Sequence, residues 1–259
     1  MRLSRRRVAG GIALLGLGAA APFVAPLLGW AQGFNRQVTQ FEPNAPYDGR
    51  YTFVRIKYTI LGDGGFRRDI KWAHDYPRGE RHFTKIVGEL STLQVRTLQS
   101  NILTLDDPEL FKFPVAYLCE AGYWLPSEAE VTGLRNYLLK GGFIIFDDFA
   151  RSDWYNFTAQ MQRVLPNLRP MRLTTDDKIF DAFYRIKSLD YNHPYYGMPS
   201  EFWGIYENND RSQRLLAIIN YNNDVSEYWE WSDEALFPLD ASNEAYKLGV
   251  NYLIYALTR

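Results

Sequence analysis

The chain has 259 residues, of which 46% are hydrophobic and 23% charged, with a formal net charge of −1. This balance is typical of a folded globular protein and excludes a disordered chain. A nearly neutral chain without a concentrated basic stripe also argues against nucleic acid as a partner. The single cysteine, Cys119, excludes an intramolecular disulfide.

The first residues are predicted to be an export signal rather than part of a fold. Arginines follow Ser4 directly, and residues 8–30 carry no charge. A basic start, an apolar run and small residues before a cleavage site define such signals, and the paired arginines indicate the twin-arginine route. The alternative is a permanent membrane anchor, but Pro22 and Pro26 would interrupt its helix. We therefore expect residues 1–31 to direct the chain to the periplasm, with a membrane tether only if this segment is not cleaved.

The rest of the chain is predicted to be one α/β domain, 50–259, behind a linker arm, 32–49, which lacks periodicity. Strands are predicted at 53–58, 95–98, 114–119, 143–146, 203–206 and 215–221, with a short one near Met171, and helices at 80–93, 127–140, 152–164, 177–183 and 243–257. This alternation indicates a mostly parallel sheet with helices on both faces, of the flavodoxin-like kind.

One helix has especially clear ends in the sequence. Ser127 and Glu130 form an S-x-x-E capping box, which satisfies two backbone donors at the helix start. Leu134 and Leu138 fall on one face, and Gly141 provides a left-handed stop. A buried strand and a pair of aspartates follow at once.

Several segments resemble one bacterial family. These segments are 72–77, 134–143, the pair Asp147-Asp148, 221–224 and 228–231. Over about 50–259 they resemble stand-alone exported members of the domain of unknown function 4159 family. The resemblance implies a fold similar to class I glutamine amidotransferases and to trehalose-utilisation proteins. It would place the nucleophile turn of an amidotransferase after strand 143–146, but Asp147 and Asp148 stand there without a cysteine or flanking glycines. Amidotransferase chemistry is therefore not expected.

The strongest candidates for a site are carboxylates at predicted strand ends. Asp147 and Asp148 end strand 143–146, and Glu120 ends the preceding strand. Ligands of open α/β sheets bind outside these strand ends, so the three are candidate catalytic residues and candidate ligands of a hard cation. Because adjacent strand residues alternate, we expect Asp147 and Asp148 to point to opposite sides. The alternative is structural: one caps the next helix and the other is solvated.

His74 joins these as a candidate acid, base or ligand, since it precedes a carboxylate in the loop after the first strand. The neighbouring Asp75, with the rings of Trp72, Tyr123 and Trp124, is a candidate binding surface. Without an H-E-x-x-H or C-x-x-C pattern, zinc is not indicated.

The segment 221–231 combines Asp224 with Trp229 and Trp231, residue types that bind sugars or partner proteins. The alternative is a turn whose rings pack on the core. Cys119 and His193 are both predicted to be structural, in a buried strand and a turn respectively.

The function expected from these features is that of an exported binding or assembly module of the cell envelope. Its ligand would be a small molecule or carbohydrate, or its partner an envelope protein, and its contact with the membrane would be limited to the signal segment. The alternative is a carboxylate- or metal-assisted hydrolase acting on carbohydrate or envelope material, so whether the chain is an enzyme stays open. No cofactor is evident, apart from a divalent cation that the carboxylates would accept.

Overall fold

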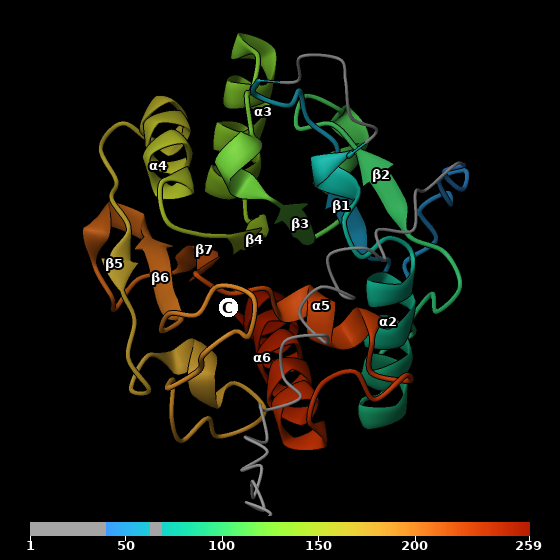
Figure 1. Cartoon of the computed structure of the whole chain (residues 1–259). Helices are drawn as coiled ribbons and strands as arrows, with labels where there is room; N and C mark the ends of the chain where they lie inside the picture. The colour runs from blue at the N-terminus through green and yellow to red at the C-terminus, as the bar shows by residue number, and fades with distance from the viewer. Residues whose placement is uncertain (1–39, 63–68) are drawn as a thin grey trace, which may run out of the picture. The chain divides into compact units, whose positions relative to one another are not determined.

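Seven strands form one mixed sheet in the order β2-β1-β3-β4-β7-β6-β5, shown in Figure 1. The computed structural model describes residues 40–62 and 69–259. The predicted signal segment, residues 32–39 of the linker arm and residues 63–68 lie outside the described residues.

The first five strands in this order are parallel, and they are β2 (Asn101–Leu103), β1 (Val54–Ile56), β3 (Val115–Cys119), β4 (Phe143–Phe149) and β7 (Leu215–Tyr221). Beyond β7, strand β6 (Glu201–Tyr206) pairs antiparallel with β7, and the edge strand β5 (Met171–Arg172) pairs antiparallel with β6. The parallel strands follow the flavodoxin-like order. The predicted α/β class with a mostly parallel sheet is therefore confirmed.

Helices cover both faces of the sheet (Figure 1). One face carries α3 (Glu128–Leu139) and α4 (Asp153–Val164), and the other carries α2 (Arg78–Leu90), α5 (Val225–Glu230) and α6 (Leu239–Thr258). Short 3-10 helices are η1 (Lys71–Ala73), η2 (Pro108–Lys112), η3 (Ala121–Tyr123), η4 (Lys178–Asp181) and η5 (Glu207–Asn209). Among the described residues, no helix combines the length and apolar character needed to cross a membrane.

The start of α3 confirms the predicted capping box. Ser127 Oγ accepts a hydrogen bond from the Glu130 amide at 3.2 Å, and Glu130 Oε2 accepts one from the Ser127 amide at 2.8 Å. Gly141 has a φ of +115°, a conformation that favours glycine. These local signals position α3, and β4 begins two residues after Gly141.

The prediction of a strand at 95–98 is wrong. The segment that pairs with β1 lies further along the chain and is β2. Val95 makes only an isolated bridge with Tyr51, and Leu98 is 73% exposed. The polar Asn101 instead begins β2, and its side chain exchanges hydrogen bonds with the backbone of Ala45 at 2.8 and 3.0 Å. The end of the predicted linker arm thus packs against an edge strand, which makes a buried asparagine tolerable there.

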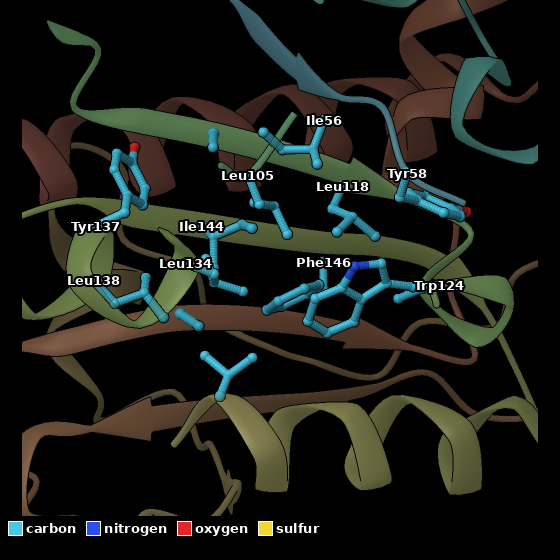
Figure 2. Close-up of a cluster of buried hydrophobic side chains, with 14 of the residues drawn as sticks. Ile56, Tyr58, Leu105, Leu118, Trp124, Leu134, Tyr137, Leu138, Ile144 and Phe146 are labelled. Carbon is cyan, nitrogen blue, oxygen red and sulfur yellow. The ribbon is translucent and has the colours of Figure 1, made fainter. Parts of the chain in front are cut away.

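One half of the core lies between the sheet and the helices α3 and α4. Figure 2 shows Trp124 beside Phe146, with Leu118 and Tyr58 close by. The ring centroids of Trp124 and Phe146 are 5.9 Å apart, and Trp124 is fully buried. A ring enclosed in this way has no free face for a ligand, so Trp124 acts as a core residue and the ligand-binding expectation for it is not supported.

Candidate functional site

The candidate residues gather where the strand order reverses. From β1 the chain moves outward to β2 and then returns to β3 on the other side of β1. His74 follows β1, and Glu120 follows β3 directly. Open α/β sheets bind ligands outside the carboxyl ends of their strands at this reversal point.

The backbone at this edge is in an unusual conformation. Asp75, Glu120 and Asp148 have φ values of 64°, 52° and 56°, in the left-handed region. Aspartate tolerates this region better than glutamate does, so Glu120 is the more costly of them. Residues held in sparsely populated conformations cluster at functional sites, where the surrounding structure enforces them.

The expectation that Asp147 and Asp148 point to opposite sides is wrong. The pairing of β4 with β7 shifts register between Phe146 and Phe149, and the left-handed turn at Asp148 reorients its side chain. Asp147 accepts a hydrogen bond from Tyr117, and Asp148 accepts one from the thiol of Cys119, at 3.1 and 3.4 Å. Tyr117 and Cys119 lie on one face of β3, so both carboxylates lie on that face too.

The contacts of Asp147 are structural. Its carboxylate accepts hydrogen bonds from the backbone amides of Val225 and Ser226, from Asn220 Nδ2 and from the Tyr117 hydroxyl, at 3.0–3.1 Å. Burial nevertheless raises the pKa of Asp147 to about 7, partly offset by these donors. Asp147 therefore ties β4 to the start of α5.

Asp148, His74 and Glu120 form the centre of the cluster. His74 Nδ1 lies 3.2 Å from Asp148 Oδ2 and 3.2 Å from Glu120 Oε1. The other ring nitrogen, Nε2, lies 2.7 Å from Asp69 Oδ1. Lys71 Nζ bridges Asp69 and Glu120 at 2.9 and 3.0 Å. One imidazole is thus oriented by a carboxylate on one side and faces two carboxylates on the other.

Electrostatics drives the pKa values of these groups apart. Burial and the nearby Asp148 raise the pKa of Glu120 to about 8. Burial alone would raise the pKa of Asp148, but hydrogen bonds involving His74 and Tyr196 outweigh it and lower the pKa to about 2. Burial opposes the charged form of His74, yet its contacts with Asp148 and Asp69 raise its pKa well above the usual value.

A second group of carboxylates lies beside the first, around the start of α5. Asp75 accepts a hydrogen bond from Ser226 Oγ, and Asp224 accepts one from the Glu227 amide at 3.0 Å. Burial and the charge of Asp148 raise the pKa of Asp75 and raise that of Asp224 well above its usual value. Burial and Asp75 raise the pKa of Glu227 to about 10. The sequence-predicted Asp75 and Asp224 thus lie buried next to the candidate cluster.

Sequence reasoning missed the tyrosines that reach into these groups. The Tyr196 hydroxyl donates to Asp148 Oδ1 at 2.6 Å, and the Tyr195 hydroxyl donates to Glu227 Oε1 at 2.9 Å. Both belong to the loop between η4 and β6, where His193 is 1% exposed against their rings. The only signal in the sequence was the turn at His193, which did not indicate where its neighbours point.

Most of the predicted aromatic candidates pack against protein. Trp229 stacks on Phe83 with centroids 4.5 Å apart, and Trp231 lies under the guanidinium of Arg78. Trp72 is buried against Phe41. Tyr123 is half-buried, and Lys71 Nζ lies 4.6 Å from the centre of its ring. Tyr123 is therefore the aromatic candidate that borders the cluster.

Among the described residues, three groups bring possible metal-ligand atoms within 4.8 Å of one another: His74, Glu120 and Asp148; Asp75, Cys119 and Asp148; and Asp75, Glu227 and Glu230. The first joins an imidazole nitrogen to two carboxylate oxygens. Asp147, a candidate ligand from the sequence, belongs to none of them, because its oxygens serve the start of α5.

The fold and this cluster define an α/β protein with a flavodoxin-like parallel core and a titratable site at its topological reversal point. Residues 52–257 match the family described as a domain of unknown function (DUF4159), and since this match covers most of the chain, the chain belongs to that family. None of the curated proteins compared with the chain is similar enough to count as a relative.

Proposed function

We propose that this chain is an exported binding protein of the cell envelope that holds a divalent cation between His74, Glu120 and Asp148. The observation that carries the proposal is the convergence of one imidazole nitrogen and two carboxylate oxygens, with 3.2 Å from the nitrogen to each oxygen. This convergence occurs at the edge of the sheet where ligands of such folds bind.

The environment of His74 supports a ligand role. Histidines that bind metals commonly donate their other ring N–H to a carboxylate, which fixes the ring and makes the ligating nitrogen more basic. Asp69 Oδ1, 2.7 Å from His74 Nε2, is positioned for this. The contacts of His74 with Asp148 and Asp69 raise its pKa well above the usual value, because carboxylates face both ring nitrogens.

The charge around the site supports a cation rather than an anion. Burial and the Asp148 charge raise the pKa of Glu120, Asp75 and Asp224, because close negative charges repel one another. A divalent cation would relieve this repulsion, and metal binding displaces protons from its ligands for the same reason.

The test is the melting temperature of the full chain in a chelator and then with Mn²⁺, Zn²⁺, Mg²⁺ or Ca²⁺. A cation at about 100 times its Kd should add about 2.7 kcal/mol of stability, a shift of a few degrees. Asp148→Asn and His74→Gln should abolish the shift, whereas the exposed Asp106→Asn should keep it. If no cation raises the melting temperature of the wild-type chain, the proposal is wrong.

A second candidate function is carboxylate-assisted hydrolysis of envelope carbohydrate. It is favoured by the separation of pKa values between Glu120, about 8, and Asp148, about 2, since such pairs assign an acid and a base. Turnover of envelope glycans that Glu120→Gln abolishes, with the fold intact, would support it. Turnover that survives in both Glu120→Gln and Asp148→Asn would exclude it.

We infer in addition that the chain is exported by the twin-arginine route and works in the periplasm. The arginines after Ser4 and the uncharged residues 8–30 support this. Cell fractionation of the wild type and of the double variant Arg5→Lys/Arg6→Lys tests it. Export that does not depend on these arginines would contradict the route.

A further inference from the structure

The two oxygens of Asp148 have different partners. Oδ2 faces His74 Nδ1 at 3.2 Å, on the side of Glu120. Oδ1 instead accepts the hydrogen bond from the Tyr196 hydroxyl at 2.6 Å. A cation held between His74, Glu120 and Asp148 would therefore meet Asp148 through Oδ2, while Oδ1 remains occupied by the phenol.

The position of the Tyr196 hydroxyl is fixed by the loop that carries it. The amide of Tyr196 donates to the carbonyl of His193 at 3.2 Å, and its carbonyl accepts from Arg151 Nη2 at 2.9 Å. The loop is closed at its base by the amide of Ser200, which donates to the carbonyl of Tyr191 at 2.8 Å. The ring of Tyr196 also packs against the buried ring of His193, with centroids 5.3 Å apart.

We propose that Tyr196 sets the cation selectivity of the site, against Ca²⁺ and in favour of an ion such as Mn²⁺, by keeping Asp148 a one-oxygen ligand. This inference rests on the proposed cation-binding function and concerns which cation is bound. Ca²⁺ takes six to eight oxygens and often binds both oxygens of a carboxylate. An imidazole ligand suits first-row transition ions better than it suits Ca²⁺, which takes oxygen ligands.

Tyr196 is a positioning residue in this scheme, since it acts on the cation through Asp148. Loss of a group that orients a metal ligand typically lowers metal affinity by 10–100-fold. Loss of the phenol hydroxyl has a second effect that depends on the ion. It frees Oδ1, which Ca²⁺ can use and a transition ion with fewer ligands does not need.

The test is isothermal titration of the full chain with Mn²⁺ and separately with Ca²⁺, for the wild type and for Tyr196→Phe. In the variant the Mn²⁺ affinity should fall by about tenfold without a matching fall for Ca²⁺, so that the ratio of the two Kd values changes by about that factor. Tyr195→Phe is the matched control, because its hydroxyl contacts Glu227 from the same loop. Its ratio should stay that of the wild type.

Equal losses of Mn²⁺ and Ca²⁺ affinity in Tyr196→Phe would overturn the inference and leave the cation site in place, since a loosened loop would weaken both ions alike. The same change of ratio in Tyr195→Phe would overturn it too. If the wild-type chain binds neither ion, this inference is wrong, whereas the proposed function is wrong only if Zn²⁺ and Mg²⁺ also leave the melting temperature unchanged.

Discussion

Arg55 Nε donates a 2.6 Å hydrogen bond to Glu80 Oε1 across the interface of β1 and α2, where the two side chains are 1% and 2% exposed. Arg55 also donates to the carbonyl of Trp72 at 3.0 Å and lies over the ring of Tyr117. Arg55 thereby links α2 to Trp72, two residues before His74. Glu80 Oε2 has no hydrogen-bond partner, so the charge of Glu80 depends on Arg55.

Arg55→Met should therefore be strongly destabilising. It leaves Glu80 buried without its counter-charge, and loss of one partner of a buried pair costs about 3–5 kcal/mol. Urea unfolding of the full chain measures this loss. The double variant Arg55→Met/Glu80→Met should recover much of it, because apolar side chains of similar volume replace a buried pair well. Lys112→Met, which removes the exposed pair with Glu109, should change little. A single variant as stable as the wild type would contradict the role of this pair.

In a chelator, the protein should lose stability as the pH rises from about 5 to 8. Burial raises the folded-state pKa of Glu120 to about 8, from an ordinary value of 4.5. Between these values the folded state binds more protons than the unfolded state, so its stability falls as pH increases. The raised pKa of His74 acts in the same direction above its unfolded value of 6.5. Asp148, whose pKa is lowered to about 2, contributes stability already present above pH 4.

Differential scanning fluorimetry across this pH range measures the effect. Glu120→Gln should flatten the decline, since glutamine carries no proton to lose. A melting temperature that rises between pH 5 and 8 in the chelator would show that the cluster is not strained by its own charge. With a bound cation the decline should shrink, because ionised carboxylates then face a positive charge.

Asp147→Ala should affect stability and leave the cation site working. The change strands the amides of Val225 and Ser226 and the side chain of Asn220, and each buried donor left without a partner costs about 1–3 kcal/mol. Urea unfolding should report this loss, while the melting shift produced by a cation persists. Loss of the cation shift in a variant that remains folded would instead make Asp147 part of the site.

Trp124→Ala should destabilise the domain without changing cation affinity. The indole is fully buried beside Phe146, and truncation of a buried tryptophan to alanine typically costs about 3–5 kcal/mol. Trp124→Phe should retain most of the stability. Calorimetric titration of both variants checks the affinity, and a selective loss of binding by Trp124→Phe would return this ring to the site.

Local sequence patterns predicted much of the fold. The capping box at Ser127 and Glu130 and the left-handed Gly141 are satisfied within a few residues, so the sequence determined where α3 begins and ends. The alternation of apolar runs and amphipathic segments likewise indicated the sheet with helices on both faces. The same alternation predicted that Glu120 and Asp148 lie at neighbouring strand ends, because the carboxyl ends of parallel strands meet at one edge of the sheet.

Only the tertiary structure decided which of these residues meet. Tyr196 lies 48 positions from Asp148, and nothing local indicates that its hydroxyl reaches Oδ1. Trp124 was predicted to be a binding residue, yet segments distant in the sequence pack around it and bury it completely. Asn101 lies outside the predicted strands, yet it begins β2, where the backbone of Ala45 satisfies its side chain. Helix caps and strand periodicity arise from neighbours in the chain, whereas the burial and hydrogen-bond partners of a side chain depend on segments that only folding brings together.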